Sequence, residues 1–230
     1  MTTNHRSPTA MNSFIFDMDG VIVDSELHWK SLEGFFLQSL IPAWTSADQD
    51  RIIGMSVHDL YRLLTADYGL QHNKEEFLDL YHDMAREIYA EKASLIPGFL
   101  NLLSWLRAKQ VRIALASSSP RPWIEMVLDR FNLYPAFEVV VSADELQGEG
   151  KPSPAIYLLT AEKLGVPPES CVVIEDSEKG VLSSRSAGMF CIGFRNGFND
   201  EQDLSTADLI ITGFQQLDSP TLTRLLRIAE

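Results

Sequence analysis

Short apolar runs recur along the chain, and helical patterns separate most of them. In a parallel sheet that is covered on both faces, strands read as near-continuous apolar segments. The apolar runs are 13–16 (SFIF), 112–116 (RIALA), 137–141 (FEVVV), 171–174 (CVVI), 189–194 (MFCIGF) and 208–211 (DLII). One helix is expected to start at Pro122, and two others are expected to end at Gly165 and Gly188. This alternation predicts an α/β fold, a doubly wound and mostly parallel sheet with helices on both faces.

One interval breaks the alternation. From about Ser25 to Ser94 no segment has a strand pattern, and apolar residues recur at helical spacing. We therefore predict a small all-helical domain over residues 25–94, inserted directly after the first strand as a lid. Residues 11–24 and 95–230 would form the core, and residues 1–10 a flexible tail. A helical subdomain that only enlarges the fold is the alternative that composition leaves open.

Composition narrows the classes of partner. The formal net charge of −13 and pI of about 4.8 disfavour binding to a nucleic-acid backbone, and no stretch is long and apolar enough to span a membrane. Both cysteines, Cys171 and Cys191, lie in or beside predicted strands, so a disulfide framework is not indicated. We expect a cytoplasmic protein, a monomer or weak homo-oligomer, that acts on a small molecule. An anionic substrate would need a metal ion or a few placed cations.

Acidic residues follow two of the predicted strands. Asp17 and Asp19 come directly after 13–16, and Glu175 and Asp176 come after 171–174. Open parallel sheets bind ligands at the carboxyl ends of their strands, so the four carboxyl groups can converge in one crevice and hold Mg²⁺. Taken alone, each pair has an ordinary explanation: an acidic turn for the first, and a helix cap at Asp176 or Ser177 for the second.

Two further segments suit a phosphate group. Ser117 and Ser118 follow the strand at 112–116, where hydroxyl and backbone N–H groups can receive phosphate oxygens; the alternative is a cap for the next helix. Lys151 lies in a Gly- and Pro-rich loop between a strand and a helix. Such a lysine is usually a solvated charge, but beside a carboxylate-rich site it would neutralise both substrate and nucleophile.

These segments, in this order, resemble the four motifs of the haloacid dehalogenase superfamily. The matching stretches are FDMDGVIVDSE, LASSSP, GKPSP and VIEDSEKGV followed by AGM. The resemblance is to the phosphatase and phosphomutase branch, which has a Rossmann-like core and a helical cap after the first motif. It implies that Asp17 is a nucleophile that forms an aspartyl-phosphate, and that Asp19 acts as general acid and then as general base.

The resemblance also implies how ligands are bound. Mg²⁺ would be held by the Asp17 carboxylate, the Asp19 backbone carbonyl and Asp176, with Glu175 as ligand or support. Ser117, Ser118 and Lys151 would bind the transferring phosphoryl group. A dehalogenase is disfavoured because it is not expected to carry the second aspartate, Asp19.

The sequence departs from the family pattern at two positions. Val57 follows Gly54-Met55-Ser56, where the sugar-phosphate mutases carry an arginine, and Ala155 stands where an aspartate is common after Lys-Pro-x-Pro. We therefore expect a Mg²⁺-dependent phosphatase that hydrolyses a small organic phosphate monoester, a sugar phosphate above all. A phosphomutase similar to beta-phosphoglucomutase and a non-catalytic binding protein are the alternatives. From the cap, His28, Arg51 and His58 are in a position to reach a substrate, although such residues more often lie at the surface.

Overall fold

A single parallel sheet forms the centre of the molecule. The structure is a computed structural model, and it describes residues 11–52, 55–146 and 150–226, which leaves the predicted tail at 1–10 outside the described residues. Six strands lie in the order β3-β2-β1-β4-β5-β6, and every pairing is parallel. The strands are β1 (Ser13–Phe16), β2 (Arg112–Ser117), β3 (Val139–Ser142), β4 (Cys171–Glu175), β5 (Phe190–Phe194) and β6 (Leu209–Ile211). All six predicted strands are confirmed, with ends that shift by one or two residues.

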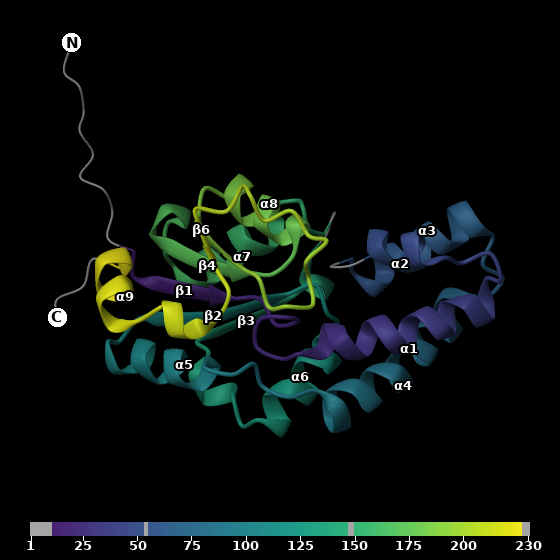
Figure 1. Ribbon diagram of the computed structural model, residues 1–230, viewed down its shortest axis with the longest axis horizontal. Coiled ribbons are helices and arrows are strands. Elements are labelled where there is room, and N and C mark those ends of the chain that lie inside the picture. Colours follow the sequence, from purple (N-terminus) through teal and green to yellow (C-terminus); the bar gives the residue numbers. More distant parts are fainter. Residues whose placement is uncertain (1–10, 53–54, 147–149, 227–230) are drawn as a thin grey trace, which may run out of the picture.

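Helices cover both faces of the sheet, as predicted (Figure 1). They are α5 (Phe99–Ala108), α6 (Arg121–Arg130), α7 (Ala155–Leu164), α8 (Glu178–Ser186) and α9 (Ser219–Leu226). Successive side chains of β1 point to opposite faces, so Phe14 and Phe16 pack in one apolar cluster with α5 and α6, and Ile15 packs in another with α7. A run that is apolar throughout is therefore what this position in the sheet requires.

The segment after β1 is helical, as the sequence predicts. It contains α1 (Ser25–Leu40), α2 (Ser46–Ile52), α3 (Val57–Tyr68), α4 (Lys74–Arg86) and a π-helical turn over Glu87–Lys92. We refer to residues 25–94 as the helical lobe. Figure 1 shows the lobe beyond the end of the sheet toward which β1 runs. Its two connections to the sheet lie side by side, because Asp24 and Ser94 hydrogen-bond through backbone and side chain, and Val23 bridges Leu95.

Helix ends follow local sequence, with small shifts from the prediction. Gly165 ends α7 in the left-handed conformation that glycine adopts at low cost. Pro122 is the second residue of α6 rather than the first, because the helix begins at Arg121. Gly188 lies one residue beyond the C-cap of α8, which is Ala187.

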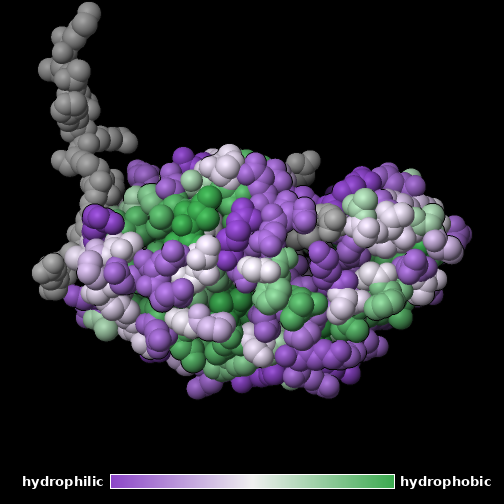
Figure 2. Space-filling view, viewed as in Figure 1, coloured by the Kyte–Doolittle hydropathy of each residue, from purple (hydrophilic) through white to green (hydrophobic). Residues whose placement is uncertain are grey.

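The surface and the cysteines agree with the composition. Figure 2 shows a visible face that is mainly hydrophilic over both the sheet region and the helical lobe, with scattered apolar patches. Cys171 and Cys191 are buried free thiols. None of the helices in the described part of the chain is both long and apolar enough to cross a membrane.

Candidate active site

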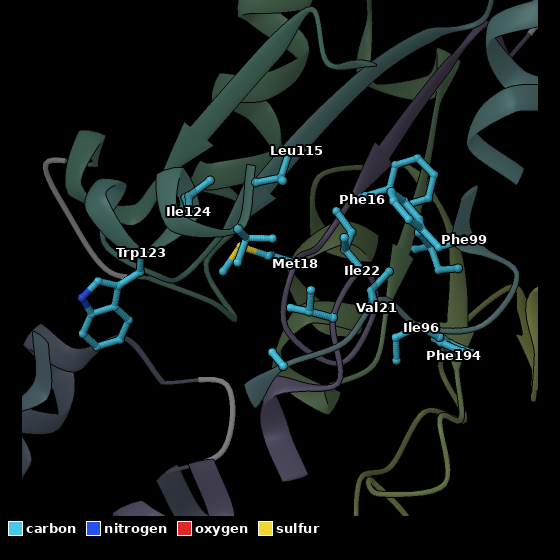
Figure 3. Packing of buried hydrophobic residues seen from close by; sticks show 14 of the residues in the cluster. Phe16, Met18, Val21, Ile22, Ile96, Phe99, Leu115, Trp123, Ile124 and Phe194 are labelled. Atoms are coloured by element: carbon cyan, nitrogen blue, oxygen red, sulfur yellow. The ribbon is translucent and has the colours of Figure 1, made fainter. Parts of the chain in front are cut away.

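The loop that follows β1 is anchored in the hydrophobic core by its apolar side chains. Met18, Val21 and Ile22 are fully buried in the same cluster as Phe16, and Figure 3 shows them around the end of β1. Asp17 continues the strand pairing, because its N–H donates to the Ile174 carbonyl at 3.1 Å. The anchored apolar residues hold the polar residues of this loop at the carboxyl edge of the sheet.

Gly20 allows the two acidic strand ends to approach each other. Its φ is +71°, and a Cβ at this position would lie 1.9 Å from Oδ2 of Asp176. Both the backbone conformation and the close approach therefore require glycine here. The Asn196 side chain ties the same elements together, since its Nδ2 donates to the Gly20 carbonyl and to Asp176 Oδ2, each at 2.9 Å.

Lys151 is the buried cation of the site. Its Nζ donates to Asp17 Oδ1 at 2.6 Å and to Glu175 Oε1 at 2.5 Å, and its side chain is only 3% exposed. Burial by itself lowers the pKa of a lysine, but the two carboxylates outweigh it and raise the pKa of Lys151 above its usual value. Lys151 therefore stays protonated. The loop that carries Lys151 is held by Ser183, whose Oγ donates to the Ser153 carbonyl at 2.6 Å. Ala155, where the sequence departs from the family pattern, is the first residue of α7.

Glu175 accepts hydrogen bonds from several side chains. Its Oε1 accepts from Lys151 and from the hydroxyl of Tyr157, and its Oε2 accepts from Ser177 Oγ at 3.2 Å. Gly180 in α8 makes room for it, because a Cβ there would lie 2.0 Å from the Glu175 carboxyl group. The predicted capping of α8 falls to Ser177, whose side chain accepts from the Gly180 N–H. Glu175 thus connects Lys151 to α7 through Tyr157 and to the start of α8 through Ser177.

Three carboxyl groups form a compact acidic cluster. Oxygens of Asp17, Glu175 and Asp176 all lie within 4.8 Å of one another, and all three residues are buried. Burial raises the pKa of Asp17 and of Asp176 well above the usual value, and neighbouring carboxylates add to the effect. One lysine offsets three acids only in part, so a divalent cation with oxygen ligands suits this charge balance. Both Glu175 oxygens already have donors, which leaves Asp17 and Asp176 as the carboxylates better able to bind a metal.

Asp19 faces the helical lobe. Its Oδ1 accepts from Ser25 Oγ and from the Tyr89 hydroxyl, both at 2.6 Å, and its Oδ2 accepts from Ser119 Oγ at 2.8 Å. Tyr89 is itself fixed by the Trp29 indole, which donates to its hydroxyl at 3.0 Å. Asp19 is therefore oriented by two donors from the lobe and one from the loop after β2.

The two predicted phosphate-binding serines lie differently. Ser118 lines a small cavity of about 20 Å³ together with Asp17, Lys151 and Asp176. Ser117 is buried, and its Oγ accepts from the Ser119 N–H at 3.0 Å, so it shapes the loop after β2. Ser118 therefore lies at the acidic cluster, whereas Ser117 is not among the described residues that line that cavity.

A larger cavity of about 320 Å³ opens from Asp19 and Asp176 into the helical lobe. Aromatic side chains line one wall: Trp29 stacks on Trp123 with ring centroids 5.2 Å apart, and Tyr89 lies beside them. Val57 also lines this cavity and presents an apolar side chain. Gly54, in the Gly-Met-Ser segment before Val57, lies outside the described residues, as does Gly148 of the loop that carries Lys151.

His28, Arg51 and His58, the residues that the sequence suggested could reach a substrate, are not among the described residues that line this cavity. His28 is 4.0 Å from Asp24, Arg51 is 3.7 Å from Asp48, and His58 is 3.3 Å from Asp144. Residues that sequence reasoning missed at the site include Tyr89 and Asn196. Asn196 follows β5 at the carboxyl edge of the sheet, the same signal that reveals Asp17, and could have been found by it. Tyr89 carries no comparable signal.

The sequence and the fold are similar to those of several known proteins. Residues 14–194 match the family model described as haloacid dehalogenase-like hydrolase. A phosphorylated carbohydrates phosphatase from Thermotoga maritima is 32% identical over 201 residues, which cover 87% of this chain and 93% of that protein. A beta-phosphoglucomutase from Bacillus subtilis is 32% identical over 209 residues, which cover 87% and 89%. The crystal structure of beta-phosphoglucomutase from Clostridium difficile has the same fold, with a TM-score of 0.76, 24% identity, and coverage of 94% and 97%.

Proposed function

Because the chain belongs to the haloacid dehalogenase-like hydrolase family, we propose that it is a Mg²⁺-dependent phosphatase that acts on a small organic phosphate monoester, a sugar phosphate above all. The single observation that carries the proposal is the buried contact between Lys151 and Asp17, in a cluster with Asp176. A carboxylate beside a fixed ammonium group and a metal-ligand set is the arrangement that phosphoryl transfer requires.

In the proposed reaction, an oxygen of Asp17 attacks the phosphorus atom as the bond to the leaving alcohol breaks. Lys151 and Ser118 bind the phosphoryl oxygens and offset their charge. Asp19 gives a proton to the leaving oxygen, and its ionised form then takes a proton from the water that attacks the aspartyl-phosphate. Inorganic phosphate leaves and Asp17 is regenerated. To reach the leaving oxygen, Asp19 must exchange one of its three hydrogen bonds for one to the substrate.

Asp17, Asp176 and the Asp19 backbone carbonyl would hold the metal, with Glu175 in support. When bound, Mg²⁺ supplies positive charge that stabilises the phosphoryl group as negative charge builds up on its oxygens. Glu175 contributes by holding Lys151 and Ser177 in place, and it neutralises part of the lysine charge. Ser117 contributes by shaping the loop that presents Ser118.

We also propose that residues 25–94 act as a cap over a core formed by residues 11–24 and 95–230. The lobe supplies Tyr89 and Ser25 to Asp19, so the position of the lobe and the orientation of Asp19 are coupled. A closed cap would keep bulk water from the aspartyl-phosphate until the leaving alcohol has departed.

A phosphomutase is the competing function, and one observation speaks against it. A mutase must hold a second phosphate in the cap, yet Val57 presents an apolar side chain to the large cavity. A non-catalytic binding protein is disfavoured because Asp17, Asp19, Lys151 and Asp176 are all retained.

The test is phosphate release from a panel of sugar phosphates, nucleotides and other small esters, in Mg²⁺ and then in EDTA. The proposal expects release from a few related esters in Mg²⁺, loss of release in EDTA, and no turnover by Asp17→Asn. A requirement for a sugar bisphosphate, with an isomerised product in place of free phosphate, would establish the mutase instead. Full activity in Asp17→Ala would refute the assigned nucleophile.

A further inference from the structure

The large cavity has an acidic lining that the proposed chemistry does not use. Among its described lining residues, four carry carboxyl groups and one, Lys30, carries an ammonium group. Two of the acids, Asp19 and Asp176, belong to the reaction site. The other two, Glu26 and Glu33, lie on α1 in the part of the cavity formed by the helical lobe. Burial raises the pKa of Glu26 to about 8 and that of Glu33 to about 7, so this part of the cavity gains negative charge as the pH rises through that range.

Glu33 is held in a fixed position by hydrogen bonds from two other helices of the lobe, α4 and α2. The Tyr81 hydroxyl in α4 donates to Glu33 Oε1 at 3.0 Å, and the Gln49 amide in α2 donates to Oε2. The Trp44 indole in turn donates to Gln49 Oε1 at 3.1 Å. Because an indole N–H can only donate, it fixes the Gln49 carbonyl oxygen toward Trp44 and the amide N–H₂ toward Glu33. Trp44, Gln49 and Tyr81 are all buried, so this chain of hydrogen bonds is well packed.

The carboxyl group of Glu33 retains capacity for a ligand. Each of its oxygens accepts one hydrogen bond from the protein and can accept another from the cavity side. Above about pH 7 the Glu33 carboxylate is ionised, so it accepts hydrogen bonds and does not donate; it then favours hydroxyl groups and repels carboxylate or phosphate groups. Burial raises the pKa of Glu33 to about 7, and the hydrogen bonds from Tyr81 and Gln49 act in the opposite direction.

We propose that Glu33 is a specificity-determining residue that accepts hydrogen bonds from the hydroxyl groups of the substrate's alcohol part. It therefore restricts the enzyme to monophosphate esters of uncharged polyhydroxy alcohols, sugars or open-chain polyols, and it disfavours esters with a second anionic group. This inference rests on the proposed function and names the class of substrate read by the cap. The aromatic wall of Trp29, Tyr89 and Trp123 would contact the apolar C–H face of such a substrate.

The test compares the wild type and Glu33→Gln at pH 8, where Glu33 is ionised, on three esters in Mg²⁺: a hexitol monophosphate, a hexose bisphosphate and phenyl phosphate. The glutamine can keep both protein contacts, since its oxygen can accept from Gln49 and its amide can donate to Tyr81. We expect kcat/KM to fall about tenfold for the hexitol phosphate, to rise for the bisphosphate, and to stay within about twofold for phenyl phosphate, which has no hydroxyl group. Glu75→Gln, which neutralises an exposed carboxylate on α4, is the matched control and should change none of the three.

The decisive quantity is the ratio of kcat/KM between two esters measured on one preparation, because that ratio does not depend on how much of the variant is folded. An unchanged ratio in Glu33→Gln, with phosphate released from the esters, would overturn the role of Glu33 and leave the phosphatase intact. Failure of the wild type to release phosphate from any of the three would refute the proposed function and this proposal with it.

Discussion

Replacing Asp17 by asparagine should stabilise the metal-free protein while it abolishes turnover. Asp17, Glu175 and Asp176 lie within 4.8 Å of one another, and Lys151 offsets them only in part. At that separation and an effective dielectric constant of about 20, two unit charges repel by about 3.5 kcal/mol. The substitution removes two such repulsions, but it also removes the attraction between Asp17 and Lys151 at 2.6 Å. At the same dielectric constant that attraction is about 6.4 kcal/mol, so the Coulombic interactions alone favour the variant by about 0.5 kcal/mol. The neutral amide also avoids the cost of burying the Asp17 charge, and because it is isosteric it keeps the packing.

The assay is urea unfolding in EDTA, followed by the same experiment in Mg²⁺. In EDTA the free energy of unfolding of Asp17→Asn should exceed that of the wild type. In Mg²⁺ the difference in free energy of unfolding between the two proteins should shrink or change sign, since the wild type binds the ion more tightly and is stabilised by mass action. Asp83→Asn, at an exposed surface pair with Arg86, serves as the control and should change stability by less than about 0.5 kcal/mol. A variant that is less stable than the wild type in EDTA would refute the electrostatic reasoning.

Three further predictions concern residues around the acidic cluster and the cavity. Gly180→Ala places a Cβ 2.0 Å from the Glu175 carboxyl group, so it should displace that group and break its hydrogen bonds. We expect steady-state kinetics to show kcat lowered by about 100-fold, and urea unfolding to show the fold destabilised by about 2 kcal/mol. Tyr89→Phe removes a donor to Asp19 and should lower kcat by about tenfold with little change in KM; an equal loss in KM would assign the residue to binding instead. Glu33 has a pKa raised to about 7, so its contribution to stability is fully present below about pH 4.5 and is lost as the pH rises through about 7. The wild type should therefore lose about 2 kcal/mol relative to Glu33→Gln between pH 5 and pH 8, and parallel stability curves would contradict the raised pKa.

The sheet and the acidic cluster could be predicted because both follow from position along a strand. A central parallel strand is buried on two faces, so its sequence is apolar throughout, and the chain turns polar where the strand ends at the crevice. Asp17, Glu175 and Asp176 are found in this way. Lys151 could be placed only through the resemblance, because its loop has no periodicity of its own.

The parts that escaped prediction depend on contacts between distant segments. Periodicity shows which face of α1 is apolar, but it does not show that Glu33 is held by residues of α2 and α4. The role of Glu175 depends on Tyr157, whose hydroxyl arrives from α7 on one face of the sheet. Nothing local to the Glu175 sequence distinguishes a metal ligand from a residue that supports the ligands.

The meeting of the two connections at Asp24 and Ser94 bears on the order in which the chain folds. Strands β1 and β2 are neighbours in the sheet, yet all of residues 17–111 lies between them, and closing a loop of about one hundred residues costs about 4 kcal/mol in chain entropy. A helical lobe that forms first, with its ends already adjacent, shortens the loop that remains to be closed. Leu64→Ala, at a buried position in α3, is therefore expected to slow refolding of the whole chain, although it lies far from the sheet. The inserted segment would then help β1 and β2 to pair, although it separates these two strands in the sequence.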